Sequence, residues 1–253
     1  MKTAILFVTH KYNSHIEHEI IKLHNETYNY AILYVLFQTE YIDLKLTDSI
    51  RSFAYSLNDL NNYNYNTWGH SIMNGNFHFV LLNFYRKNPN YDYYWIIEYD
   101  VRYCGNWKSF FSFFDEKEDD FISSHIEFYT DNPDWPSWDS IELFKLKISM
   151  FDYLRSFNPI CRFSNRACSL LDERCRIGDR GHNEVLLPTL FYYYGLKIAD
   201  FGGSGKFIYK NNYIPFYTDD PTIIDADPCT HRFRPLYKEE DCIIPNMIYH
   251  PVK

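Results

Sequence analysis

Two acidic residues stand two positions apart at the end of an apolar run. Glu98 and Asp100 follow the segment Tyr93 to Ile97, and side chains two positions apart in an extended chain point to the same side. Carboxylate oxygens are ligands that Mg²⁺ and Mn²⁺ prefer, and these ions also contact substrate phosphates. An exposed strand end can carry the same pair without a function. Because this pair directly follows a strongly apolar strand, we predict that it forms a divalent metal site.

The overall charge excludes one class of ligand and restricts another. The 253 residues carry a formal net charge of −8 and contain no block of Lys or Arg, which argues against nucleic acid binding through phosphate neutralisation. A diphosphate ligand then needs a local cation, either a metal ion or a few basic side chains. The 24 Tyr and 21 Phe residues suit a packed core and also a polar cleft, although an AT-rich genome would produce the same bias.

The N-terminal segment has the pattern of a strand, a helix and a second strand. Ala4 to Val8 is a continuous apolar run, typical of a strand buried on both faces of a parallel sheet. Ser14 and Glu17 form a capping box that predicts the start of a helix, and Ala31 to Phe37 predicts the next strand. Such a unit places its binding crevice at the C-terminal ends of the strands.

The rest of the chain continues this alternation. The sequence predicts helices over 77–87, 106–114 and about 184–194, and strands over 93–97, 120–126, 157–163 and 196–201. Residues 51–68 have the composition of a loop or a short irregular helix, and 131–140 break regular structure. We predict one α/β domain spanning 1–253, with a mostly parallel twisted sheet flanked by helices.

The N-terminus and the cysteines bear on location. MKTAILFVTHKYNSH contains only a short apolar run, too short for a signal peptide, and no later run approaches the roughly 20 residues that a membrane span needs. We expect a cytoplasmic protein and leave open a contact with the inner face of the membrane. The six cysteines form no C-x-x-C pair, so we expect reduced, mostly buried thiols rather than zinc ligands.

The segment around the acidic pair resembles a known motif. YDYYWIIEYDVRY, residues 91–103, is similar to the strand and DXD-like motif of GT-A fold glycosyltransferases, in particular of poorly characterised microbial and fungal families with a WxxExDVRY-type signature. Gly181 to Thr189 and Ile248 to Lys253 match as well, so the resemblance covers most of the chain. The first acid of the motif is Glu98, whereas the usual DXD motif has Asp.

The resemblance implies a role for each residue of the motif. Asp100 would bind Mn²⁺ or Mg²⁺ directly, and Glu98 would contact the donor ribose or a metal-bound water. Arg102 would balance the local negative charge or reach the nucleotide-sugar donor. The alternative for Arg102 is a solvated side chain that follows the strand.

The C-terminal stretch is the second part of the implied donor site. GT-A enzymes often close this site with a histidine on the metal and a basic residue on the diphosphate. The resemblance therefore implies that His250 is a metal ligand and that Lys253 binds the donor. His231 competes with His250 for the same role.

Glu184 lies near the start of a predicted helix, behind Gly178 and Gly181. In inverting GT-A enzymes a carboxylate at such a helix start accepts the proton of the acceptor hydroxyl, so the resemblance implies that Glu184 is the catalytic base. The alternative is that it only complements the helix dipole. Asp179 is the second candidate for the base.

Two loops are further candidates for substrate contact. Trp135 and Trp138 flank Pro136 and would either form a wall against an acceptor sugar or anchor their loop to the core. Gly202 to Lys206 is glycine-rich but lacks the P-loop pattern, so we expect a flexible loop that covers the donor.

Together these features predict a metal-dependent, hexosyltransferase-type glycosyltransferase. It would move a sugar from a nucleotide-diphosphate sugar to a glycan or lipid-linked glycan acceptor, with inversion, in cell-surface polysaccharide or lipopolysaccharide synthesis. Residues up to about Asp100 would form the nucleotide-binding half, and 101–253 the acceptor half. Two alternatives stay open: a metal-dependent phosphoesterase or nucleotidyltransferase, which would need a third nearby acid, and a non-catalytic glycan-binding module.

Overall fold

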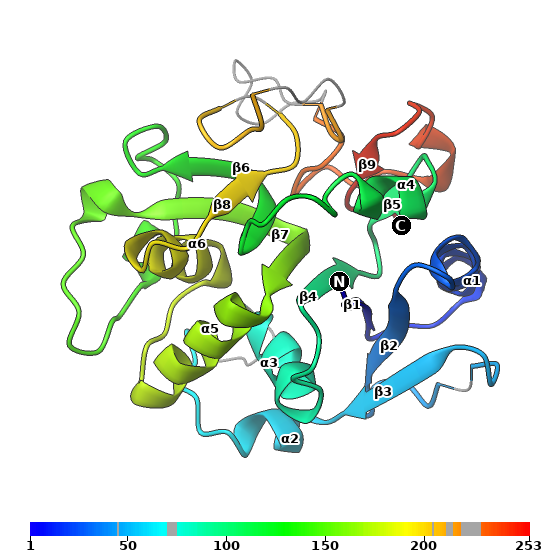
Figure 1. Cartoon of the computed structure of the whole chain (residues 1–253), viewed down its shortest axis with the longest axis horizontal. Helices are drawn as coiled ribbons and strands as arrows, with labels where there is room; N and C mark the ends of the chain where they lie inside the picture. The colour runs from blue at the N-terminus through cyan, green and yellow to red at the C-terminus, as the bar shows by residue number, and fades with distance from the viewer. Residues whose placement is uncertain (45, 70–74, 204, 211–214, 219–228) are drawn as a thin grey trace.

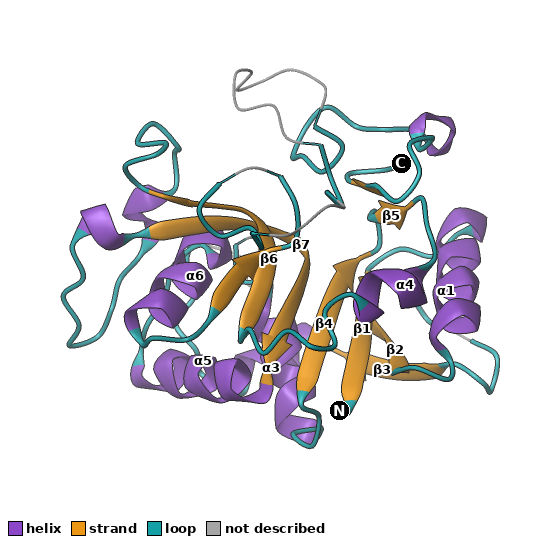
Figure 2. Ribbon diagram, turned by 45° about the horizontal axis from the view of Figure 1, so that its top comes forward, coloured by secondary structure: helices purple, strands orange, loops and turns teal. Residues whose placement is uncertain are grey.

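A seven-stranded sheet runs through the whole molecule. The computed structural model describes residues 1–44, 46–69, 75–203, 205–210, 215–218 and 229–253. The strand order is β3-β2-β1-β4-β7-β6-β8, and Figure 2 shows the twist of the sheet. The strands are β1 (Thr3–Thr9), β2 (Ile32–Gln38), β3 (Arg51–Tyr55), β4 (Tyr93–Glu98), β6 (Phe121–Phe128), β7 (Leu154–Ser164) and β8 (Ile198–Asp200).

The sheet is mostly parallel. β1 pairs in parallel with β2 and with β4, β2 with β3, and β6 with β8. Only β7 runs antiparallel to its two neighbours, β4 and β6. The carboxyl ends of β1, β2, β3 and β4 therefore lie on one edge, which is where open α/β sheets bind their ligands.

Helices cover both faces, and the alternation of strand side chains explains how. Leu6 and Ile96 point into one apolar core with α3 (His78–Lys87), α5 (Asn165–Ile177) and α6 (Asn183–Tyr193). Ile5 and Ile97, their direct neighbours in sequence, point into the second core with α1 (Ser14–Thr27) and α4 (Trp107–Ser112). Figure 1 shows the two helical layers on opposite sides of the sheet. The short α2 (Leu57–Asn61) joins the first core through Leu60.

The α/β fold class and most of its elements are confirmed, with three corrections. The cap of α1 is Asn13, whose side chain accepts from the Ile16 N–H at 3.0 Å, so the capping box expected at Ser14 is wrong by one residue. Residues 51–55 form an edge strand that the sequence left irregular, and α5 was not predicted at all.

A second, two-stranded sheet brings distant parts of the chain together. β5 (Arg102–Tyr103) follows β4 directly, and β9 (Ile248–Tyr249) pairs with it antiparallel. Ile248 and Tyr249 are buried. In Figure 2 the C-terminus accordingly lies close to β5, beyond the carboxyl end of β4.

The described helices can be compared with the length and hydropathy that a membrane span needs. Within the ranges described above, no helix combines the length and the apolar character that a membrane crossing requires.

A buried arginine holds the connection between α4 and β6. Arg162 on β7 is 1% exposed. Its guanidinium donates to the carbonyls of Phe114, Lys117 and Asp119 at 2.8, 2.6 and 3.1 Å, and it lies 4.1 Å from the ring centroid of Tyr93.

Replacing this arginine is expected to destabilise the fold. Arg162→Ala leaves three carbonyl oxygens without their charged donor and opens a cavity, so the free energy of unfolding should fall by about 3 kcal/mol or more. Urea denaturation measures this change. Lys206→Ala removes an exposed ion pair with Asp131 and should cost less than about 1 kcal/mol. Equal effects of the two substitutions would contradict the role of Arg162.

Candidate active site

The acidic pair lies where β4 ends and the chain turns toward β5. Glu98 is the last residue of β4 and pairs in register with Val8 of β1. Asp100 follows in the turn and is 5% exposed, whereas Glu98 is partly exposed. Arg102 braces this turn, because its guanidinium donates to the carbonyls of Tyr99 and Val101 at 2.9 and 3.0 Å.

The C-terminal segment supplies the basic residues. The pairing of β9 with β5 places His250 and Lys253 beside the acidic pair. A further backbone hydrogen bond, from the Val252 N–H to the Asp100 carbonyl at 2.9 Å, fixes the segment at the same turn. Both basic side chains therefore depend on backbone pairing between residues about 150 positions apart in the sequence.

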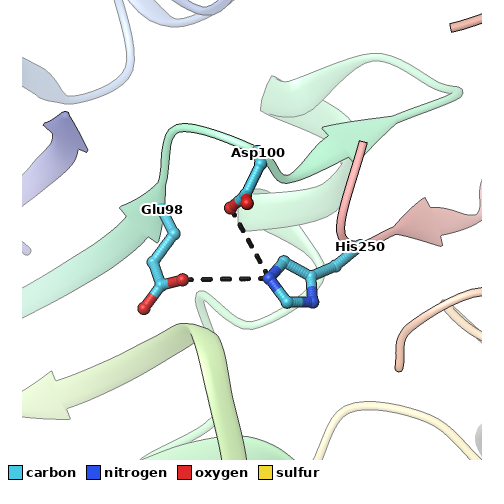
Figure 3. A group of neighbouring side chains, drawn as sticks. All are labelled: Glu98, Asp100 and His250. Atoms are coloured by element: carbon cyan, nitrogen blue, oxygen red, sulfur yellow. Dashed lines mark ion pairs between the residues drawn. The ribbon is translucent and has the colours of Figure 1, made fainter. Parts of the chain in front are cut away.

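Figure 3 shows that both carboxylates point toward one nitrogen of His250. Nε2 of His250 lies 3.5 Å from Asp100 Oδ1 and 3.8 Å from Glu98 Oε2. Lys253 approaches from another side, with its Nζ 3.7 Å from Asp100 Oδ2. Two acids and two bases thus meet at one point.

The other ring nitrogen of His250 determines the tautomer. Nδ1 lies 2.7 Å from the carbonyl oxygen of Arg232, and a carbonyl oxygen only accepts hydrogen bonds. Nδ1 therefore carries a hydrogen, and Nε2 is the nitrogen available to a metal. A backbone carbonyl that orients a histidine in this way is the usual arrangement behind a metal-ligating imidazole.

The charges in this group shift the pKa of its members in opposite directions. Burial acts to raise the pKa of Asp100, but the nearby His250 and Lys253 outweigh it and lower that pKa. Burial acts to lower the pKa of His250, but Asp100 and Glu98 outweigh it and raise that pKa to about 9. Without a bound ion the imidazole is therefore protonated at neutral pH and forms an ion pair with the acids.

The group fits a divalent metal ion. One ligand atom from each of Glu98, Asp100 and His250 lies within 4.8 Å of the others. Bonds of about 2.1 Å space the ligands of an ion roughly 3 to 4.2 Å apart, so the three atoms need to move by less than about an ångström. Asp100 Oδ1 is buried, and its partner among the described residues is His250 Nε2 at 3.5 Å, so both of these atoms face the place that an ion would occupy.

One cavity of about 250 Å³ contains this group and Glu184. Glu184 is the second residue of α6, and His182 caps that helix by accepting from the Glu184 N–H at 3.4 Å. Burial raises the pKa of the Glu184 carboxyl to about 8, with Arg155 acting in the opposite direction. A carboxyl group with a pKa near neutrality is suited to proton transfer.

Hydrogen bonds from β7 hold the start of α6. Oδ1 of Asn158 accepts from the hydroxyls of Ser123 and Ser156 at 2.7 and 2.8 Å, so its Nδ2 must face the other way. That Nδ2 donates to Asn183 Oδ1 at 2.8 Å. The Asn183 N–H donates in turn to the Gly75 carbonyl at 2.7 Å. The helix that carries Glu184 is therefore tied to the sheet and to the loop before α3.

A second cavity of about 460 Å³ lies beside the first, and Lys253 lines both. Lys11, Asn13 and Tyr99 also line it, which places it at the N-terminus of α1. Backbone N–H groups at a helix N-terminus attract anions.

The structure brings five of the six predicted site residues into the first cavity: Glu98, Asp100, Glu184, His250 and Lys253. Arg102 lines only the second cavity, and it is buried rather than solvated. Its Nε and Nη2 atoms lie 2.8 Å from Glu239.

The two residues that the sequence offered as alternatives, His231 and Asp179, line neither cavity. His231 is fully buried behind His250, with ring centroids 5.7 Å apart, and burial lowers its pKa well below the usual range. Asp179 is held by the guanidinium of Arg174 at 2.7 Å and lines neither cavity. In the glycine-rich loop, Gly203 packs against Tyr217 and Ser204 lies outside the described residues.

Sequence reasoning missed several cavity residues. Asn158 lies within an otherwise apolar strand. A polar residue in such a strand is the sequence feature that could have identified it as a site residue. His182 and Asn183 belong to the segment that carries the resemblance, but only Glu184 was singled out. Gly75 and Phe157 also line the cavity and gave no signal in the sequence.

Comparison with known proteins does not identify the function, which must be inferred from the site. No family model and no curated protein matches the sequence. A solved structure of the galactosyltransferase LgtC with donor and acceptor sugar analogues is 12% identical, with 79% of this chain and 73% of that chain covered and a TM-score of 0.45.

Two further solved structures are similar at a comparable level. A putative glucose-1-phosphate thymidylyltransferase from Bacillus anthracis is 8% identical, with 79% and 86% of the chains covered and a TM-score of 0.42. The glycosyltransferase GlyE of Streptococcus pneumoniae TIGR4 is 10% identical, with 79% and 45% covered and a TM-score of 0.38. Since all three TM-scores lie below 0.5, no activity is transferred from these proteins.

The geometry of the acidic pair predicts metal-dependent stabilisation. Mn²⁺ together with UDP or GDP should raise the melting temperature, because ligands of the native state stabilise it by RT ln(1 + [L]/Kd). Asp100→Ala should abolish this shift. Glu142→Ala, at an exposed acid paired with Arg180, should retain it. An unchanged shift in Asp100→Ala, measured by differential scanning fluorimetry, would show that the ion binds elsewhere.

Proposed function

We propose that the protein is a GT-A glycosyltransferase of the hexosyltransferase type, which moves a sugar from a nucleotide-diphosphate donor to a hydroxyl of a glycan or lipid-linked glycan, with inversion. The observation that supports this proposal is the composition of one cavity. It holds Glu98, Asp100 and His250 in a metal-ligand arrangement, Lys253 beside them, and the partly buried carboxyl of Glu184 at a helix start.

Asp100 and His250 would hold Mn²⁺ or Mg²⁺, and Glu98 would contact the donor ribose or a water on the ion. When bound, such an ion supplies positive charge that offsets the negative charge developing on a departing diphosphate. Lys253 adds a second cation at the same place. In a chain with a net charge of −8, these local cations are what makes an anionic donor acceptable.

The second cavity suits the nucleoside part of the donor. Its volume of about 460 Å³ lies in the range of small-molecule sites. Lys253 lines both cavities, so a diphosphate beside its ammonium group would extend from the nucleoside in one cavity to the sugar in the other. Residues up to about Asp100 would supply Lys11, Asn13 and Tyr99 to the nucleoside site, and 101–253 would add Lys253 to it and carry Glu184.

Glu184 would act as the general base. Its carboxylate takes the proton from the acceptor hydroxyl while that oxygen forms a bond to the anomeric carbon. The bond between the anomeric carbon and the diphosphate oxygen breaks, and its electron pair leaves with the nucleoside diphosphate. A single displacement of this kind inverts the anomeric configuration. We propose assembly of cell-surface polysaccharide or lipopolysaccharide as the setting, because it consumes nucleotide sugars.

The role of Glu184 is tested by a substitution that preserves its shape. Glu184→Gln cannot accept a proton, so turnover should fall by roughly 10²–10⁴. The affinity for nucleoside diphosphate with Mn²⁺ should change little, whereas Asp100→Ala should lose that affinity. Release of nucleoside diphosphate from a set of UDP- and GDP-hexoses measures turnover, and calorimetry measures binding. Turnover near that of the parent, or retention of the anomeric configuration, would refute the inverting mechanism.

The pH dependence of the rate has a defined sign. Burial raises the pKa of Glu184 to about 8, and a general base works only when it is deprotonated. The rate should therefore rise about tenfold per pH unit below pH 8 and level off above it. Glu184→Gln should flatten this limb of the profile. A parent rate that is constant between pH 6 and 8 would contradict the assignment of the base.

A further inference from the structure

Two tryptophans from separate loops flank His182, a residue that lines the first cavity. The ring centroids of Trp68 and His182 lie 5.0 Å apart, and those of Trp135 and His182 lie 6.0 Å apart. Both tryptophans are only partly buried. His182 Nδ1 lies 3.7 Å from Glu184 Oε2, so His182 connects this aromatic group to the proposed base.

A glycine makes the approach of these rings possible. Gly75 has a φ of +78°, a conformation that favours glycine. A Cβ atom at this position would lie 2.6 Å from Trp68 Cε3 and 2.8 Å from His182 Cδ2. Trp68 and His182 are thus packed directly against backbone at the cavity, so their positions are defined by close contact.

His182 presents a hydrogen-bond donor in this group. Its Nδ1 accepts from the Glu184 N–H at 3.4 Å and lies 3.7 Å from Glu184 Oε2, and the hydrogen bond from the N–H assigns the ring hydrogen to the other nitrogen. Burial lowers the pKa of His182 to about 4, so the ring is neutral at pH 7 and its single hydrogen is on Nε2.

The structure separates the two tryptophans that the sequence paired. Trp138 is 3% exposed and its Nε1 donates to the Asn132 carbonyl at 2.8 Å, so it anchors the loop. Trp135 is partly exposed, and the Arg155 guanidinium lies 5.5 Å from its ring. The charge of Arg155 acts to lower the pKa of Glu184, and its guanidinium pairs with Glu127.

We propose that Trp68, His182 and Trp135 form the acceptor subsite, and that the acceptor is a pyranose sugar. This inference rests on the proposed function. A pyranose has apolar C–H faces and a rim of hydroxyls. Indole rings cover the faces, His182 Nε2–H donates to one hydroxyl, and Glu184 accepts the proton of another. A peptide or a bare lipid does not combine both features in one small ring.

The test uses p-nitrophenyl glycosides of glucose, galactose, mannose, N-acetylglucosamine and N-acetylgalactosamine, in both anomers, as probes. Binding is measured by equilibrium dialysis, through the nitrophenyl absorbance, with Mn²⁺ and UDP or GDP present. At least one glycoside should bind saturably and also increase nucleotide release from a nucleotide sugar.

Trp135→Ala should raise the dissociation constant of that glycoside about tenfold, since an aromatic contact has roughly this value. Trp135→Phe, which keeps a ring, should restore most of the affinity, and Trp68→Ala should weaken binding in the same direction. Tyr193→Ala is the control, because this partly exposed ring lies at the other end of α6. Thermal melting establishes that each variant is folded.

Donor hydrolysis without acceptor separates the two proposals. The control Tyr193→Ala should hydrolyse the donor at the parent rate, and the same measurement on Trp135→Ala reports whether its donor site is intact. If the parent hydrolyses the donor and no glycoside binds, or if Trp135→Ala binds as well as the parent, the acceptor subsite is refuted. Stimulation by peptides alone would refute it as well. If glycosides bind through Trp135 but no nucleotide sugar is ever hydrolysed, the transferase function fails and the sugar subsite stands.

Discussion

The confinement of two like charges at the end of β4, with Asp100 buried and Glu98 partly exposed, is the constraint on which the site depends. Asp100 is 5% exposed and lies next to Glu98, and two carboxylates do not remain ionised together in a poorly solvated place without cations. His250 and Lys253 supply that charge from the last four residues of the chain. The pairing of β9 with β5 and the bond from Val252 to Asp100 are therefore conditions for the site to exist.

Two carboxyl groups of the first cavity have their pKa values shifted in opposite directions. Cations lower the pKa of Asp100, which keeps it ionised. Glu184 Oε2 lies 3.7 Å from His182 Nδ1, but burial lowers the pKa of His182 to about 4, so this imidazole is neutral at pH 7. Burial raises the pKa of Glu184 to about 8. Two carboxyl groups whose environments separate their pKa values are suited to two roles, a permanent anion and an exchanger of protons. The rigid connection from Asn158 through Asn183 to Gly75 keeps Glu184 in its place.

Local sequence patterns predict the elements with strong apolar periodicity and fail where burial uses other residues. β1 and β4 are continuous apolar runs, and the apolar residues of α3 recur at helical spacing. The sequence alone therefore predicts these three elements. The buried face of α5 consists largely of Ala167, Cys168, Leu171 and Cys175, and small residues and thiols make a weak stripe. β3 is an edge strand in which only Tyr55 is fully buried, so its pattern is that of a loop.

Some residues of the site could also be predicted from local sequence patterns, whereas others depend on contacts between distant segments. The acidic pair and the residues near the C-terminus were predicted through short motifs that resemble a family. The contacts of Trp68, Gly75 and His182 join segments about 100 positions apart, and nothing in either segment alone indicates them. The contact between Arg102 and Glu239 was not predicted for a related reason, because Glu239 lies far along the chain.

The position of Lys253 links the two cavities energetically. Its ammonium group lies 3.7 Å from Asp100, and at this separation a unit charge pair interacts by about 4 kcal/mol at an effective dielectric constant of 20. In the proposed function, an ion held by Asp100 and His250 neutralises the acid and weakens its hold on Lys253. The ammonium group is then available to a diphosphate that extends from the second cavity. Metal and donor would therefore bind with positive coupling, which is reciprocal by thermodynamic necessity. In the proposed function, the ion and the anionic donor would each bind more tightly when the other is present.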